Sequence, residues 1–146
     1  MTTTSNSTGP YLNAALLCEK VLQEKDGVIS VIRMIDRITL TALASSSPET
    51  LQPMPVSLYA LISFKSGNAK GRHTVKLVTE TPSGIRLPEQ LFPALFEGDD
   101  RGVNLVLNIN VVVDQEGVYW FDVILEDQVL TRMPLRILYQ RVGQSM

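Results

Sequence analysis

The sequence predicts an all-β protein, an antiparallel β-sandwich of about seven or eight strands. Short runs rich in Val, Ile and Leu alternate with turn segments rich in Gly, Pro, Asn and Asp along most of the chain. Residues 103–113 carry apolar side chains at every second position, which is the period of a strand with one buried face. No long segment has the period of an amphipathic helix.

The first half of the chain is expected to supply four strands. They span residues 11–22, 28–40, 56–65 and 72–81. Asp26-Gly27 separates the first two strands and is a strong hairpin signal. Residues 43–55 contain three serines and three prolines and are expected to form a loop.

The second half begins with an irregular stretch, residues 85–102, in which a single helical turn is expected around Glu89–Leu95. The remaining strands span residues 103–113, 118–125 and 129–139. Alternation places these side chains in the core: Tyr119, Phe121, Val123, Leu125, Val129, Met133, Leu135, Ile137 and Tyr139.

The same alternation gives two expectations for the last hairpin. If the turn between these strands centres on Asp127, Asp122 lies opposite Arg132 as a surface ion pair worth under about 1 kcal/mol. Pro134 has no amide hydrogen for a ladder, so its strand is expected at a sheet edge or with a bulge.

Composition limits the classes of function. The 146 residues carry 13 Lys and Arg against 15 Asp and Glu, a formal net charge of −2, so no electrostatic case arises for a nucleic-acid or membrane partner. One cysteine and one histidine exclude a disulfide framework, a thiolate zinc cluster and a multi-histidine metal site. We therefore expect neither a metal nor a cofactor.

Residues 1–10 are polar and rich in Ser and Thr, and are expected to form a flexible leader ahead of a single domain over residues 11–146. The leader has neither the basic nor the apolar region of a secretory signal. No apolar run reaches the length of about 18 residues needed to cross a membrane. The simplest expectation is a cytoplasmic protein, which agrees with the single Cys18.

Residues 117–127, followed by residues 133–137, resemble the C-terminal hairpin of many immunoglobulin-like sandwiches. Together with residues 16–19 and 27–32, they resemble a family of small bacterial proteins of unknown function. The resemblance covers roughly residues 11–139 and implies an immunoglobulin-like β-sandwich. It implies no catalytic residue, because none is assigned in that family.

Apolar side chains on the face opposite the expected core predict an interaction surface. Trp120 is its central residue, because tryptophan is enriched at interface hot spots. The other candidates are Ile124, Leu130, Val106 and Val112. In the alternative interpretation, the loops 43–55 and 82–102 cover this face, or each apolar residue is isolated.

Acidic residues in the turns give a second hypothesis. Carboxylates from different loops at one end of a sandwich can converge on calcium or a small ligand. The candidates are Asp99, Asp100, Glu126 and Asp127, which strand counting places at the same end. Ordinary turn and solvation roles also account for these residues, and no spacing matches an EF-hand.

Catalysis is disfavoured by the residues available. Cys18 and His73 lie on different expected strands, and Cys18 is interpreted as a small buried core residue. The sequence has no phosphate-binding glycine loop, nucleophile elbow or zinc-protease motif, although a carboxylate-based hydrolase stays an alternative. We expect a non-enzymatic module that binds a protein partner or its own copy, with a calcium- or ligand-binding sandwich as the alternative.

Overall fold

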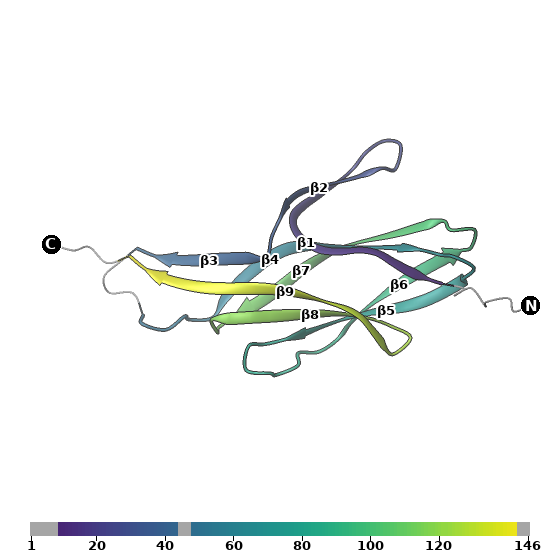
Figure 1. Cartoon of the computed structure of the whole chain (residues 1–146). Helices are drawn as coiled ribbons and strands as arrows, with labels where there is room; N and C mark the ends of the chain where they lie inside the picture. Colours follow the sequence, from purple (N-terminus) through teal and green to yellow (C-terminus); the bar gives the residue numbers. More distant parts are fainter. Residues whose placement is uncertain (1–8, 44–47, 143–146) are drawn as a thin grey trace, which may run out of the picture.

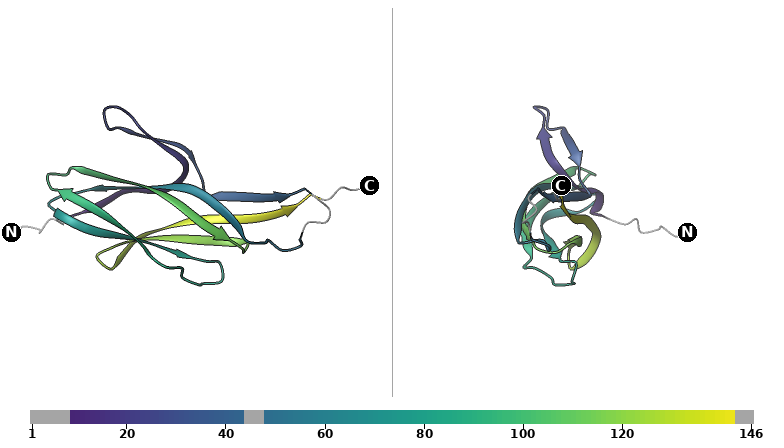
Figure 2. Two further views of the ribbon diagram at one scale, coloured as in Figure 1. Left: turned by 180° about the vertical axis from the view of Figure 1, so that it is seen from behind. Right: turned by 90° about the vertical axis from the view of Figure 1, so that its left-hand side faces the viewer.

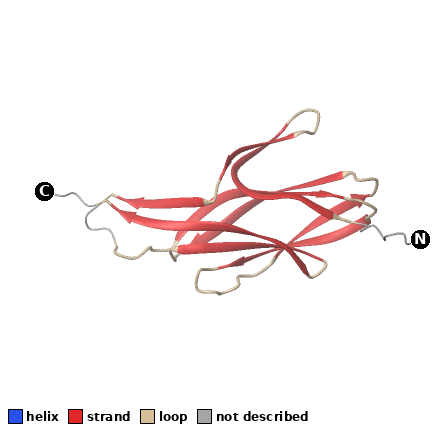
Figure 3. Ribbon diagram, in the orientation of Figure 1, coloured by secondary structure: helices blue, strands red, loops and turns tan. Residues whose placement is uncertain are grey.

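The computed structural model describes residues 9–43 and 48–142, and their regular structure consists of nine β-strands with no helix (Figures 1 and 3). The strands are β1 (Tyr11–Gln23), β2 (Ile29–Met34), β3 (Arg37–Ala42), β4 (Met54–Lys65), β5 (Lys70–Glu80), β6 (Gln90–Glu97), β7 (Gly102–Val113), β8 (Gly117–Leu125) and β9 (Gln128–Arg141). Most of the expected leader, residues 1–8, lies outside the described residues. The described part of the chain has no helix long and apolar enough to span a membrane.

The strands form two sheets that pack as a sandwich (Figure 1). One sheet has four strands in the order β2-β1-β4-β7, and the other has five in the order β3-β9-β8-β5-β6. Every pairing between strands is antiparallel except that of β3 with β9, which is parallel. The predicted all-β sandwich is confirmed, with nine strands and one parallel pair.

The connectivity is immunoglobulin-like. Strands β1, β4 and β7 occupy the places of strands A, B and E, and β5, β8 and β9 those of C, F and G. The β1–β2 hairpin leaves the body of the sandwich and projects from it (Figure 2). A hairpin was expected here from Asp26-Gly27, and its turn is closed by hydrogen bonds between Glu24, Gly27 and Val28.

Tyr119, near the start of β8, supplies a second immunoglobulin-like feature. Its ring is fully buried, and its hydroxyl accepts a hydrogen bond from the Asp114 amide at 3.1 Å. This contact between a buried tyrosine and the chain just upstream is the tyrosine corner of such sandwiches. Burial raises the pKa of the phenol, which keeps the hydroxyl protonated.

The core lies between the sheets and follows the alternation of the strands. Phe64 of β4 meets Phe96 of β6 edge to face, with ring centroids 5.6 Å apart. In the last hairpin the buried apolar residues are Tyr119, Phe121, Val123, Leu125, Met133, Leu135 and Ile137, as predicted. Tyr139 is partly buried against this core.

The expected strand 28–40 is divided between the two sheets. β2 pairs with β1, whereas β3 pairs with β9 in the opposite sheet. The chain crosses at Ile35 and Asp36, where the Ile35 amide donates to the Leu17 carbonyl and the Asp36 carbonyl accepts from the Arg136 amide. These two bonds tie the Ile35 amide to one sheet and the Asp36 carbonyl to the other, at the point where the chain changes sheets.

The helical turn expected around Glu89–Leu95 is wrong, because this segment forms β6. Phe92, Ala94 and Phe96 point toward the core, while Leu91 and Leu95 stay more than half exposed. β6 is an edge strand that pairs only with β5 among the described strands. Pro93 is tolerated there because one side of an edge strand needs no amide donor.

A register shift between Val123 and Ile124 changes two assignments in β9. Ile124 pairs with Val129, and Val123 with Thr131. Val129 therefore points outward and is 50% exposed, so its place in the predicted core is wrong. Leu130 packs against the core instead of facing outward. A one-residue bulge reverses the facing of the residues beside it.

Pro134 lies where the sequence placed it, at a sheet edge. β3 pairs with β9 only from Arg136 to Arg141, so the first half of β9 has β8 as its one neighbour in the sheet. The crossover at Asp36 thus leaves the stretch around Met133 and Pro134 uncovered on one side. Two cavities open there, and they define the candidate site.

Candidate interaction surface

The five residues predicted as one apolar surface lie in three different places. Trp120 and Ile124 are half-buried on the outer face of the five-stranded sheet. Val106 and Val112 belong to β7, in the four-stranded sheet, and are 42% and 60% exposed. Leu130 packs against the core. The prediction of a single continuous patch is wrong, because the strands that carry these residues belong to opposite sheets.

Trp120 is flanked by polar and rigid neighbours. In the sheet it pairs with Glu80 of β5 on one side and Pro134 of β9 on the other. The guanidinium of Arg132 lies over its ring, 4.7 Å from the centroid. A cation over an aromatic face is attracted by the ring's quadrupole and covers the ring from solvent.

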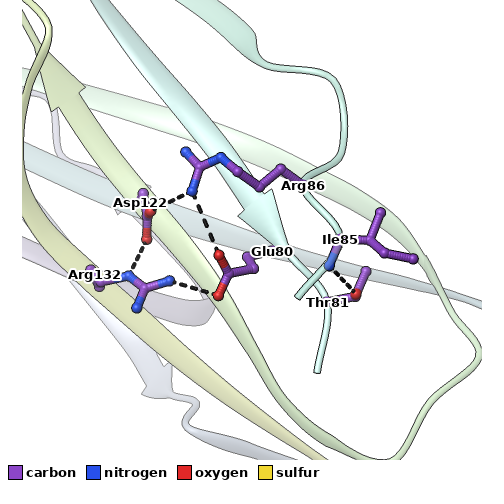
Figure 4. A network of polar contacts seen from close by, with 6 residues as sticks. All are labelled: Glu80, Thr81, Ile85, Arg86, Asp122 and Arg132. Atoms are coloured by element: carbon purple, nitrogen blue, oxygen red, sulfur yellow. Dashed lines mark hydrogen bonds and ion pairs between the residues drawn. The ribbon is translucent and has the colours of Figure 1, made fainter. Parts of the chain in front are cut away.

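A four-residue charged network holds Arg132 in this position (Figure 4). Arg132 donates to Asp122 at 2.6 Å and to Glu80 at 3.1 Å. Arg86 approaches the same two carboxylates, at 3.5 Å from Asp122 and 3.6 Å from Glu80. The hydrogen bond to Asp122, followed by the one to Glu80, raises the pKa of Arg132. Two guanidiniums and two carboxylates make the network neutral.

The predicted pairing of Asp122 with Arg132 is confirmed, but its surroundings differ from the prediction. Asp122 is only 3% exposed, because Arg86 and Arg132 cover it. Its carboxylate is thus buried, whereas the side chains of Glu80, Arg86 and Arg132 are 26%, 49% and 40% exposed. The sequence did not lead us to expect Glu80 and Arg86 in this network. The available signal is the turn at Pro82 and Gly84, which brings Arg86 back beside Glu80.

A groove opens beside Trp120 on the same face. A cavity of about 340 Å³ is lined by Asp36, Arg37, Val118, Trp120, Pro134 and Arg136. Arg37 and Arg136 are register partners on the parallel strands β3 and β9, and both line this cavity. Both residues are exposed, and neither forms an ion pair with any carboxylate of residues 9–43 or 48–142.

The groove continues across the side of the sandwich. A second cavity, of about 250 Å³, is lined by Leu16, Met34, Arg132 and Met133 among others. Asp36 and Pro134 line both cavities, which makes the two cavities neighbours. Together the two cavities have Arg37 and Arg136 at the Trp120 end, and apolar side chains with Arg132 at the Met34 end, with Asp36 between them. We call the two cavities together the Trp120 groove.

The acidic turn residues do not converge on one point. Glu126 lies 2.6 Å from the ring of His73, and Asp127 lies 3.4 Å from the amine of Lys76. Asp99 and Asp100 form a tight turn between β6 and β7 with φ angles of 54° and 57°. Nowhere in the described chain do three or more His, Cys, Asp or Glu side chains gather as metal ligands. The geometry therefore gives no support to a calcium site at these loops.

Cys18 and His73 are not brought together. Cys18 lies in β1 of the four-stranded sheet, and His73 lies in β5 of the other sheet, paired with Glu126. Cys18 is fully buried, as expected, and burial raises the pKa of its thiol. A buried thiol with a raised pKa is a poor nucleophile at neutral pH.

A family model described as a family of unknown function, DUF6941, matches residues 13–138. The chain belongs to this family. The resemblance seen in the sequence is thereby confirmed in its two main points, an uncharacterised family and an immunoglobulin-like fold. No curated protein matches the chain. Among solved structures, the chain is similar to an immunoglobulin-like protein from Pseudomonas aeruginosa, with 11% identity, a TM-score of 0.46, and coverage of 91% of this chain and 99% of that one.

Proposed function

We propose that this DUF6941 protein is a non-enzymatic interaction module whose Trp120 groove binds an extended, acidic segment of a protein partner. The observation that carries the proposal is a pair of neighbouring arginines beside Trp120, Arg37 and Arg136, which form no ion pair within residues 9–43 and 48–142. Tryptophan and arginine are the residues most enriched at binding hot spots. Guanidiniums side by side favour carboxylates, which each can bind through two hydrogen bonds.

The shape of the groove supports a peptide segment as the ligand. Its two neighbouring cavities pass from Arg37 and Arg136 to a part where Leu16, Met34 and Met133 lie beside Asp36 and Arg132, so the second part offers apolar contacts in addition to charge. An acidic segment that also carries apolar side chains complements both ends. Arg132 is already fixed by Asp122 and Glu80, so its position over Trp120 costs no additional ordering on binding.

The single tryptophan makes the proposal directly testable, because the intrinsic fluorescence of the chain comes mainly from Trp120. The full chain would be used to select binders from a displayed library of random peptides. We expect enrichment of peptides that combine Asp or Glu with apolar residues. Synthetic copies of these peptides should change the fluorescence of Trp120 in a saturable titration.

Charge reversal in the groove provides the matched comparison. Arg37→Glu with Arg136→Glu should weaken peptide binding at least tenfold, since both attractive contacts become repulsive. Arg72→Glu reverses an exposed charge on β5, outside the groove, and should leave the affinity within about twofold. The proposal would be contradicted if the selected peptides were not enriched in Asp and Glu. It would also be contradicted if the double variant bound them with the affinity of the wild type.

A further inference from the structure

β7 is an edge strand whose second side is unpaired among the described residues. The four-stranded sheet ends at β7, which pairs with β4 over its whole length, from Gly102 to Val113 (Figure 2, left). At twelve residues it extends about 40 Å. A row of amide and carbonyl groups along such an edge is a template for another strand.

The other three edge strands carry features that discourage pairing. β2 has only six residues and contains Arg33 in the left-handed region, with φ of 57°. β3 also has six residues and begins at Arg37. β6 contains Pro93 and ends at Glu97. Short length, charge, proline and local twist are the usual protections of an exposed edge.

β7 has none of these protections. It contains no charged residue and no proline, and its register with β4 runs from Met54–Val113 to Lys65–Gly102 without a shift. Its inward side chains fill the core, while its outward ones are exposed: Asn104, Val106, Asn108, Asn110 and Val112. A long, regular and uncharged edge is the kind that pairs with a further strand.

We infer that β7 pairs antiparallel with β7 of a second copy of this chain, about a two-fold axis near the middle of the strand. The pairing joins the two four-stranded sheets into one sheet of eight strands. Such an interface is isologous, so any charge on the strand would approach its own copy near the axis. β7 has no charge, so self-pairing brings no like charges together, and a charged partner strand finds no opposite charge there.

The side chains of β7 also suit self-pairing. Apolar residues and asparagines alternate along the strand, so an antiparallel copy placed in phase continues the apolar inner face and the asparagine-rich outer face across the axis. Asn108 already accepts a hydrogen bond from Asn110 at 2.6 Å on the outer face. Asparagine side chains near the axis can make the same kind of bond to the second copy.

Sedimentation velocity of the full chain tests this inference, with Asn108→Lys as the main variant. Asn108 is exposed, so lysine there leaves the core intact while placing two positive charges near the axis. We expect the wild type to be a dimer and Asn108→Lys a monomer with an unchanged circular dichroism spectrum. Ser57→Lys is the control: Ser57 is exposed and pairs with Asn110 from β4, one strand in from the edge, and the dimer should persist.

A charge-swap experiment identifies the symmetry of the interface. Asn108→Asp alone should also be monomeric, and an equimolar mixture of Asn108→Asp and Asn108→Lys should again form dimers, because opposite charges then meet near the axis. A wild type that stays monomeric at roughly 100 μM overturns the inference. So does an Asn108→Lys variant that dimerises like the wild type, or a dimer lost on reversal of Arg37 and Arg136 instead.

Discussion

Arg132 lies over Trp120, and two carboxylates, those of Asp122 and Glu80, fix its guanidinium there. Asp122 is the more buried of the two, with a side chain 4% exposed, and it contacts both Arg86 and Arg132. Burying a carboxylate without its cations would lower the stability of the fold. Holding two cations together without a carboxylate between them would lower it as well. The network therefore links the stability of this face to the position of the aromatic ring.

Asp122→Asn tests this link, because asparagine keeps the shape of the side chain and removes its charge. We expect a loss of about 2 kcal/mol in unfolding free energy, below the usual cost of breaking a buried pair because both arginines can turn toward solvent. The emission of Trp120 should move to longer wavelength as Arg132 is released from its ring. Urea denaturation and fluorescence measure the two effects.

The control for that experiment is Glu97→Gln. Glu97 and Arg101 form an exposed pair at 3.2 Å, and such pairs contribute little. The unfolding free energy of the Glu97→Gln variant should differ from that of the wild type by less than about 0.5 kcal/mol. If both variants lost the same amount, burial of Asp122 would not be the source of the effect.

At the scale of the elements, the turns show how local sequence and backbone geometry fit together. The β8–β9 turn consists of Glu126 and Asp127, with φ angles of 53° and 61°. Two left-handed residues between paired strands make a type I′ hairpin, which favours Asn-Gly or Asp-Gly. Neither residue is glycine, so this turn is more strained than its geometry requires.

Asp127→Gly should therefore stabilise the protein, by roughly 0.5 kcal/mol. The substitution also removes an ion pair between Asp127 and Lys76 at 3.4 Å. This pair contributes little to stability, because the Asp127 side chain is 91% exposed. Asp114→Gly is the comparison, because Asp114 is in a turn without a left-handed φ, and glycine should lower stability there. Thermal denaturation of the two variants would show opposite signs; a loss in both would refute the role of the turn.

At the scale of the whole molecule, the two proposed surfaces occupy opposite sides of the sandwich. The Trp120 groove lies where β1 and β2 of one sheet meet β9 and β3 of the other. β7 lies at the far end of the four-stranded sheet, against β6. Sites that share no residues and are far apart contribute independently. A dimer through β7 would thus carry two grooves.

This arrangement predicts that each function survives loss of the other. The Asn108→Lys variant should bind the selected acidic peptides with the affinity of the wild type, measured by Trp120 fluorescence. Conversely, Arg37→Glu with Arg136→Glu should sediment as the wild type does. Loss of both properties in either variant would show that binding and pairing use one surface.

Several features of this protein could be predicted from its sequence because they depend on neighbours in the chain. Alternation of apolar and polar residues identifies strands and their inner faces, and the buried row Tyr119, Phe121, Val123 and Leu125 follows directly from it. Asp26-Gly27 marks a hairpin. The short turn after Leu125 predicts that the last two strands pair, and the register shift between Val123 and Ile124 sets Arg132 opposite Asp122. The fold class is accessible by the same reasoning.

The tertiary structure decided what depends on residues far apart in the chain. The pattern of residues 28–40 does not show the crossover at Asp36, because Ile and Val suit either sheet. The bulge in β9 turned Leu130 toward the core. Trp120 and Val106 are separated because their strands, β8 and β7, belong to opposite sheets. The meeting of Arg37 with Arg136 comes from a parallel pairing between strands far apart in the chain. Long-range pairing is fixed by packing of the complete core, and no local pattern encodes it.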